Sequence, residues 1–248
     1  MTSSHLLSTA ATSSSAKARR TPRLVLFDLD GTLADTAPDL INAVLAAGAE
    51  HQLTPRSRVN LRALVGRGGG PMIEAAFGNR DSAKHAQLIA RFLAHYGQHV
   101  CTQTALFPGM RQTLYSLAQQ GIAWGVVTNK PHALATRVMY YLNAPPGCAI
   151  VVGAGAAAAA KPSPLGLWLA ASKVGIAPAQ VWYVGDDERD IVAAHSAGMV
   201  GVAASWGYIP PDTCVARWGA DLILGEPGDL SAEIAACSHS APAGLLIT

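Results

Sequence analysis

Two aspartates stand two residues apart in the stretch Asp28-Leu29-Asp30-Gly31-Thr32, directly after a short apolar run. At the end of a strand, this spacing lets both carboxylates project toward the same side. One carboxylate can attack an electrophilic centre, and the second can donate a proton to a leaving oxygen. Gly31 lets the backbone turn sharply and approach a ligand closely. An Asp-x-Asp pair alone is common, and the two residues could instead cap a turn.

Three further polar groups follow along the chain, each at the end of an expected strand or in the loop after one. They are the pair Thr128-Asn129, the lysine Lys161, and the run Gly185-Asp186-Asp187-Glu188-Arg189-Asp190. A hydroxyl and a lysine can bind the charged oxygens of a phosphoryl group. Acidic side chains supply the hard oxygen ligands that Mg²⁺ prefers. Together with the first pair, these groups contain what phosphoryl transfer to a carboxylate requires.

Three of these side chains also have simpler structural interpretations. Lys161 follows a glycine and five alanines at 155–160, and a lysine in such a loop could merely be solvated. Asp187 and Glu188 stand where a helix is expected to begin, and acidic residues there stabilise the helix dipole. For these two acids we favour the helix-start interpretation over direct metal binding.

Short apolar runs that alternate with helical patterns supply the elements that must position these groups. Strands are expected at 24–27, 123–128, 149–152, 181–184, 200–203 and 222–224, and helices at 110–120, 131–142, 164–174 and 188–197. Strands separated by helices of this length form βαβ units with a parallel sheet that is covered on both faces. The sequence therefore predicts an α/β fold with a doubly wound parallel sheet.

One interval breaks this alternation, because residues from 38 to about 106 show helical patterns and no convincing strand. An apolar stripe at helical spacing, which we interpret as core packing, contains Leu88, Ile89, Phe92, Leu93 and Tyr96. The segment begins just after the first strand, so it is expected to lie over the carboxyl end of that strand, where ligands bind in open α/β sheets. The sequence predicts an inserted all-helical cap that serves as a lid.

Composition excludes several classes of protein. Half of the 248 residues are hydrophobic and 14% are charged, which favours one folded α/β domain with a smaller insert. The formal net charge is +2, with no stripe of interleaved basic and aromatic residues, so we expect no nucleic-acid partner. The longest nearly uncharged run, 148–160, is shorter than the roughly 20 residues of a membrane-spanning helix, so we expect no membrane partner.

The ends of the chain and the cysteines complete the domain assignment. Residues 1–22 are rich in Ser, Thr and Ala and are expected to be a disordered tail, with an organelle transit peptide as the alternative. The four widely spaced cysteines form no CxxC pair, which favours reduced thiols in the cytoplasm. We expect a catalytic core at 23–37 and 106–236, a helical cap at 38–105, and a C-terminal tail at 237–248.

The polar motifs, taken in chain order, resemble those of the haloacid dehalogenase superfamily of phosphatases. Motif one is Asp28-Leu29-Asp30-Gly31-Thr32, motif two is Thr128, motif three is Lys161, and motif four is 185–190. The resemblance covers nearly the whole chain beyond the N-terminal tail. Segments 106–109, 126–131, 185–191 and 206–208 are further similar to the phosphoglycolate phosphatase subfamily, and N-acetylmuramic acid 6-phosphate phosphatases fit almost as well.

The resemblance implies roles for the first and last motifs. Asp28 is the expected nucleophile that forms a phosphoaspartate, and Asp30 is the expected acid and then the base that activates water. Mg²⁺ is expected at Asp28, at the backbone carbonyl of Asp30 and at Asp186. Asp187 and Asp190 are expected in supporting positions.

The resemblance also implies which groups bind the rest of the substrate. Thr128 and Lys161 are expected to bind the phosphoryl oxygens, assisted by backbone N–H groups near Gly31 and Asn129. The alanine run before Lys161 departs from the family, whose members usually carry polar residues there. In the cap, Arg67 lies in a glycine-rich segment whose position resembles the one that reaches the non-phosphate end of the substrate, so it could pair with a substrate carboxylate.

The implied function is Mg²⁺-dependent hydrolysis of a small phosphomonoester, with 2-phosphoglycolate as the expected substrate. The alternatives are an N-acetylmuramic acid 6-phosphate phosphatase, and a sugar phosphomutase in which a second hydroxyl replaces water. A non-catalytic phosphate- or partner-binding protein is a further alternative, against which the presence of Asp28, Asp30 and Asp186 argues. The expected partner is a small molecule, and the expected assembly is a monomer or a homodimer.

Overall fold

The computed structural model describes residues 20–57, 59–79 and 81–239. Most of the expected N-terminal tail, 1–19, lies outside the described residues, as does 240–248 of the expected C-terminal tail. The helix α8 (Asp229–His239) continues past residue 236, where we expected the core to end. Leu230 and Ile234 of this helix are buried against the core, which explains why the helix does not stop earlier.

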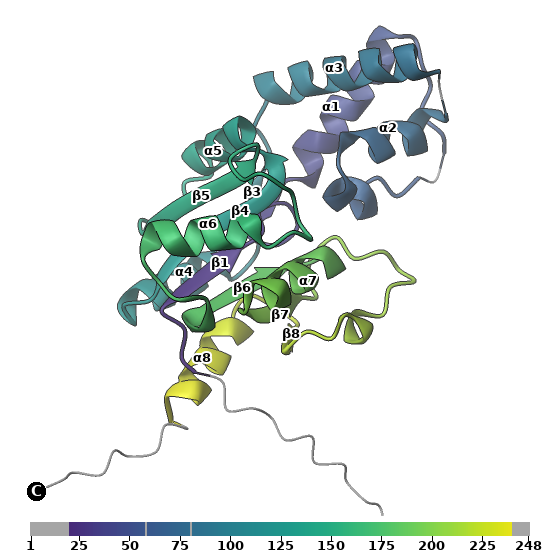
Figure 1. Cartoon of the computed structure of the whole chain (residues 1–248). Helices are drawn as coiled ribbons and strands as arrows, with labels where there is room; N and C mark the ends of the chain where they lie inside the picture. The colour runs from purple at the N-terminus through teal and green to yellow at the C-terminus, as the bar shows by residue number, and fades with distance from the viewer. Residues whose placement is uncertain (1–19, 58, 80, 240–248) are drawn as a thin grey trace, which may run out of the picture.

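A six-stranded parallel sheet forms the centre of the larger part of the molecule (Figure 1). Its strands, in spatial order, are β5 (Cys148–Ala154), β4 (Ala123–Pro131), β1 (Leu24–Phe27), β6 (Val181–Gly185), β7 (Val200–Ala204) and β8 (Leu222–Leu224). All neighbouring strands pair in parallel. The expected α/β fold with a parallel sheet is therefore confirmed.

The first strand lies at the middle of the sheet, between β4 and β6. The chain proceeds from β1 to one side through β4 and β5, and then returns to the other side through β6, β7 and β8. In open parallel sheets, ligands bind outside the carboxyl ends of the strands where the strand order reverses in this way. The three expected motifs at the ends of β1, β4 and β6 therefore meet at one place.

Helices cover both faces of the sheet, and two apolar clusters fill the space beneath them. On one face Val25 and Phe27 pack in a cluster shared with α4 (Met110–Gln119), α5 (His132–Tyr141) and α8. On the other face Leu24 and Leu26 pack with α6 (Leu165–Val174) and α7 (Glu188–Ala197). Successive residues of β1 are all buried but point to opposite faces, as expected of a central strand.

The expected helical insert consists of α1 (Ala37–Glu50), the 3-10 helix η1 (Arg62–Arg67), α2 (Gly69–Phe77) and α3 (Ser82–Gln98). Figure 1 shows these helices grouped apart from the sheet. Asp81 begins α3 because its side chain accepts a hydrogen bond from the Lys84 N–H. The buried residues Leu88, Phe92 and Tyr96 of α3 belong to the same apolar cluster as Val25 and Phe27, so the insert packs directly against the core.

The structure adds two short strands at the boundaries of the expected insert, one just before residue 38 and one at its end near residue 106. The strands β2 (Ala34–Asp35) and β3 (Ala105–Leu106) pair antiparallel, so the segment entering the insert lies beside the segment leaving it. Two residues are too few to show an alternating pattern, which is why the sequence gives no sign of these strands. Two further 3-10 helices, η2 (Pro178–Gln180) and η3 (Val215–Trp218), lie in loops of the core.

Within the described residues, none of the helices combines the length and the apolar character that crossing a bilayer demands.

Candidate active site

A cavity of about 850 Å³ lies between the carboxyl ends of the strands and the helical insert. The core contributes the polar part of its wall, which includes Asp28, Asp30, Thr128, Asn129, Lys130, Lys161, Asp186, Asp187 and Asp190. The insert contributes Arg67 with its neighbouring glycines and an apolar wall that includes Met72, Ile89, Phe92 and Tyr96. The cavity therefore collects every candidate side chain of the sequence motifs.

Asp28 and Asp186 approach each other closely at the base of the cavity. Gly31 adopts φ +93°, and a Cβ at this position would overlap the Asp186 carboxylate. Only a residue without a side chain therefore fits between the first motif and the last. The Asp28 side chain is mostly buried, and its Oδ1 accepts a hydrogen bond of 2.7 Å from the Leu29 N–H.

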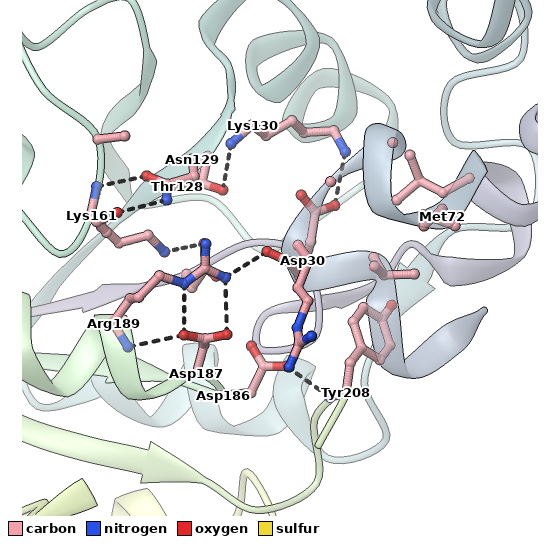
Figure 2. A pocket seen from close by; sticks show the side chains of 18 of the residues that line it. Asp30, Met72, Thr128, Asn129, Lys130, Lys161, Asp186, Asp187, Arg189 and Tyr208 are labelled. Carbon is pink, nitrogen blue, oxygen red and sulfur yellow. Dashed lines mark hydrogen bonds and ion pairs between the residues drawn. The ribbon is translucent and has the colours of Figure 1, made fainter. Parts of the chain in front are cut away.

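Asp28, Asp186 and Asp190 form a compact acidic cluster. One carboxylate oxygen of each residue lies within 4.8 Å of the others, and all three residues are buried. Asp186 is fixed by the Thr32 hydroxyl, which donates at 2.9 Å, and by the Tyr208 N–H, which donates at 2.7 Å. Figure 2 shows Asp186 next to Tyr208. Burial, followed by the charges of Asp28 and Asp190, raises the pKa of Asp186 well above its usual range.

The chemistry of this donor set fits a hard divalent cation. All of the ligand atoms offered are carboxylate oxygens. Burial and then the mutual repulsion of the carboxylates raise the pKa of Asp186, and a bound cation would offset the repulsion. Asp190 shows the same environment, because burial raises its pKa to about 6, although Lys161 acts in the opposite direction. Among the described residues, this is the only cluster of three such side chains.

Lys161 reaches the same cluster from the loop after β5. Its Nζ lies 2.9 Å from Asp28 Oδ1 and 2.7 Å from Asp190 Oδ1, and it donates to the Tyr183 hydroxyl at 2.9 Å. Burial lowers the pKa of Lys161, but Asp190 and Asp28 more than offset this effect, so the net shift is upward. The alternative of a solvated loop lysine is therefore wrong.

Asn129 explains how a loop rich in alanine holds Lys161 in place. The Lys161 N–H donates to Asn129 Oδ1 at 2.8 Å, and Asn129 Nδ2 donates back to the Lys161 carbonyl at 3.1 Å. Figure 2 shows both contacts joining the end of β4 to the loop. Thr128, next to Asn129, is buried and lines the cavity. The side chain of Asn129 thus orients Lys161 in addition to any backbone contact with a ligand.

Asp187 begins helix α7. Its side chain accepts from the Arg189 N–H at 2.9 Å, and its own N–H donates to Asp190 Oδ2 at 3.1 Å, which forms a capping box. The Asp187 carboxylate also pairs with the Arg189 guanidinium at 2.8 Å. The structure thus places Asp187 as a helix-capping residue at the rim of the acidic cluster.

Arg189 also connects the core to the insert. One guanidinium nitrogen donates to the Gly66 carbonyl at 2.7 Å, next to Arg67. Arg67 itself is exposed and lines the cavity. The Arg189 contact holds the glycine-rich segment at the mouth of the cavity.

Asp30 lies apart from the three-carboxylate cluster. Its Oδ1 accepts a hydrogen bond from the Thr36 hydroxyl at 2.6 Å and forms an ion pair with Lys130 Nζ at 2.8 Å. The two aspartates of the first motif therefore have different surroundings: Asp28 joins Lys161 and the acidic cluster, whereas Asp30 faces Lys130. Such a separation suits one carboxylate for attack and the other for proton transfer.

Sequence reasoning missed several residues of the site. Lys130 and Thr128 are two residues apart on β4 and both are buried, so strand alternation could have placed Lys130 beside Thr128. Tyr208, whose N–H binds Asp186, lies in a segment that we noted only for its resemblance. Tyr183 lies within the buried strand β6, where no pattern marks its hydroxyl as a partner of Lys161.

Comparison with known proteins identifies one family, and its similar relatives carry two different substrate names. The family described as "Haloacid dehalogenase-like hydrolase" matches residues 25–204. A phosphoglycolate phosphatase of Xanthomonas campestris is 44% identical over 211 residues, which cover 85% of this chain and 96% of the relative. An N-acetylmuramic acid 6-phosphate phosphatase of Pseudomonas aeruginosa is 39% identical over 209 residues, which cover 84% of this chain and 92% of the relative.

A solved structure supports the same fold. The crystal structure of a predicted phosphoglycolate phosphatase from Haemophilus somnus superposes with a TM-score of 0.77 and 27% sequence identity. The match covers 86% of this chain and 98% of the other. The similarity of fold thus extends over most of both chains.

Proposed function

The chain belongs to the haloacid dehalogenase-like hydrolases, and from this premise we propose that it hydrolyses small phosphomonoesters through a phosphorylated Asp28. One observation carries the proposal: the Asp28 carboxylate follows the central strand, lies 2.9 Å from the amino group of Lys161, and shares the buried acidic cluster with Asp186 and Asp190. A nucleophile in this position faces both the groups that bind a phosphoryl dianion and those that hold a cation.

In the first step, an oxygen of Asp28 forms a bond to phosphorus while the bond from phosphorus to the alkoxide breaks. Asp30 gives its proton to the departing oxygen, so the product is an alcohol. In the second step, Asp30 takes a proton from water, and the resulting hydroxide attacks phosphorus and releases inorganic phosphate from Asp28. The separate environments of the two carboxylates support these different roles.

Thr128 and Lys161 bind the phosphoryl oxygens in this proposal, together with backbone N–H groups near Gly31 and Asn129. The burial of Thr128 and Lys161 at the cavity wall supports this role, because a donor shielded from water binds a dianion more strongly. The Asn129 hydrogen bonds keep the Lys161 backbone in register with the end of β4.

We further propose Mg²⁺ as the cation, held by Asp28, Asp186 and the backbone carbonyl of Asp30, with Asp190 and Asp187 in supporting positions. When bound, it supplies the positive charge that lets an anionic carboxylate approach an anionic phosphate. The all-oxygen donor set and the raised pKa of Asp186 support this assignment. Thr32 and the Tyr208 N–H keep Asp186 pointed toward Asp28.

The proposed substrate is 2-phosphoglycolate, with the helical segment 38–105 as the cap that selects it and Arg67 as the partner of its carboxylate. The name of the Xanthomonas relative and the place of Arg67 at the cavity support this choice. A second candidate, N-acetylmuramic acid 6-phosphate, is favoured by the size of the cavity. The cavity volume of about 850 Å³ is larger than a two-carbon acid fills, and such an acid has little apolar surface to contact the apolar wall of the cap.

Phosphate release from both candidates, from sugar phosphates and from nucleotides, measured with added Mg²⁺, tests the proposal. We expect one of the two carboxylate-bearing esters to have the highest kcat/KM, and the Asp28→Asn protein to fold but release no phosphate. A rearranged sugar phosphate in place of inorganic phosphate would identify the phosphomutase. Wild-type protein that releases no phosphate from any ester would favour the non-catalytic alternative.

A cytoplasmic location and a monomer or homodimer complete the proposal. The free state of all four cysteines supports a reducing compartment.

A further inference from the structure

Lys130 is a buried cation for which the steps above have no use. Its side chain is 4% exposed at the end of β4, and its Nζ lies 2.8 Å from Asp30 Oδ1. Burial lowers the pKa of Lys130, but the charge of Asp30 and the neighbouring Tyr96 more than offset this effect, so the net shift is upward. A buried amino group is costly unless it is paired, so the contact with Asp30 is what stabilises Lys130 in this place.

Tyr96 of helix α3 covers Lys130 from the side of the insert. Its ring centroid lies 4.5 Å from Lys130 Nζ, within the range of a cation–π contact. Tyr96 is 1% exposed, and its hydroxyl has no hydrogen-bond partner among the described residues. The Tyr96 ring is therefore in direct contact with the amino group of Lys130.

Two core residues near the junction with the insert contact Asp30. Thr36, which precedes α1, donates to the same Oδ1 that Lys130 contacts. Oδ2 of Asp30 accepts no hydrogen bond from the residues that the structure describes, and Asp30 lines the cavity. Lys130 and Thr36 thus restrain one oxygen and leave the other for a ligand in the cavity. Figure 2 shows the contact between Lys130 and Asp30.

We propose that Lys130 is a positioning residue that directs the Asp30 carboxyl group at the leaving oxygen of the substrate, and that Tyr96 of the insert holds Lys130 in place. The inference rests on the proposed function, in which Asp30 protonates that oxygen. In this arrangement the orientation of Asp30 depends on the packing of α3 against the core, because without the Tyr96 ring the amino group of Lys130 is free to turn away from Asp30.

The choice of leaving group separates this role from a general structural one. An alkoxide is a poor leaving group and needs a proton as it departs, whereas 4-nitrophenolate departs without one. The value of kcat/KM reports the steps up to departure of the alcohol. A residue that acts through Asp30 therefore affects alkyl esters much more than 4-nitrophenyl phosphate.

The test compares Lys130→Met with wild type on 4-nitrophenyl phosphate and on the alkyl phosphate that wild type hydrolyses best. For the alkyl ester we expect kcat/KM to fall about 100-fold, the scale of a general-acid contribution, and for the aryl ester less than about threefold. Lys130→Arg keeps the charge and should recover at least about tenfold of the alkyl activity. Lys173→Met, which removes an exposed lysine on α6, is the matched control and should match wild type.

Tyr96→Leu tests the contribution of the insert. It removes the ring and should reproduce the selective loss on the alkyl ester, and Tyr96→Phe, which keeps the ring, should lose less. Thermal unfolding of each variant verifies that the protein compared is folded, and Lys130→Arg and Tyr96→Leu keep the inference testable if Lys130→Met unfolds.

Two results would overturn the inference while leaving the proposed function intact. One is an equal fall of kcat/KM on alkyl and aryl esters, which indicates a structural role. The other is a higher KM for the alkyl ester with unchanged kcat, which indicates that Lys130 binds substrate directly. Failure of the proposed function has a different signature, namely wild-type protein that hydrolyses neither ester.

Discussion

Replacement of Asn129 by alanine should cost both stability and activity, through the same two hydrogen bonds. Asn129 joins the end of β4 to the Lys161 backbone in both directions, at 2.8 Å and 3.1 Å. At about 1 kcal/mol for each hydrogen bond, Asn129→Ala should lower the free energy of unfolding by about 2 kcal/mol. Denaturant unfolding followed by tryptophan fluorescence measures this change, with Asn42→Ala on the exposed side of α1 as the control, expected within about 0.5 kcal/mol of wild type.

The loss of activity should be larger than the loss of stability implies. Lys161 is held within 2.9 Å of Asp28, and a displacement of about 1 Å at a catalytic group can lower the rate about 100-fold. We therefore expect kcat/KM of folded Asn129→Ala to fall between about 10-fold and 100-fold. If Asn129 acts through Lys161, adding Asn129→Ala to Lys161→Met should change kcat/KM by less than about threefold.

The reasoning would be refuted if Asn129→Ala lost about 2 kcal/mol of stability but kept the wild-type kcat/KM. That result would show that the position of Lys161 does not depend on its contacts with Asn129. A full further loss in the Lys161→Met background would refute it as well, because Asn129 would then act on the substrate independently.

Three further predictions follow from the cavity and the acidic cluster. Arg67→Ala should raise KM for the carboxylate-bearing substrate about tenfold and leave kcat for 4-nitrophenyl phosphate unchanged; an equal effect on both esters in steady-state assays would contradict a carboxylate contact. Mg²⁺ at about 100 times its Kd should raise the free energy of unfolding by about 2.7 kcal/mol, and Asp186→Ala should abolish this gain in calorimetry; a gain of the same size in the variant would place the cation elsewhere. In protein freed of metal by a chelator, the pKa of Asp190 is raised to about 6, so the folded state binds a proton at Asp190 more tightly than the unfolded chain does. The stability gained from this proton is therefore present at low pH and declines as pH rises from about 4 to about 6. Asp190→Asn should reduce this slope in unfolding titrations, and stability that increases over the same interval would oppose the assignment.

The sequence predicts the scaffold well because parallel strands leave strong local patterns. The bounds of β1, β8 and α7 agree with expectation, and the motifs that end β1, β4 and β6 meet because the carboxyl ends of parallel strands lie at one edge. The apolar stripe of α3 is also evident, since its spacing matches a helix.

The partners within the site are less predictable, because they depend on contacts between distant segments. Nothing in the sequence near Asp30 shows that Lys130, a hundred positions away, will pair with it. Tyr96 belongs to a stripe that we interpreted as core packing, and it is indeed buried there, but its ring also faces Lys130. The alanine run made the position of Lys161 uncertain, and only the structure shows that Asn129 compensates.

The antiparallel pairing of β2 with β3 has a consequence for how this architecture can change. Because Ala34 lies opposite Leu106 and Asp35 opposite Ala105, the chain leaves the core and returns to it at nearly the same point. An inserted segment with equally close ends could be transplanted at this junction without moving β1 or β4, since paired strands lie only about 5 Å apart. In the proposed function the insert selects the substrate, so exchange of the insert at this junction would change specificity and leave the residues at the strand ends in place.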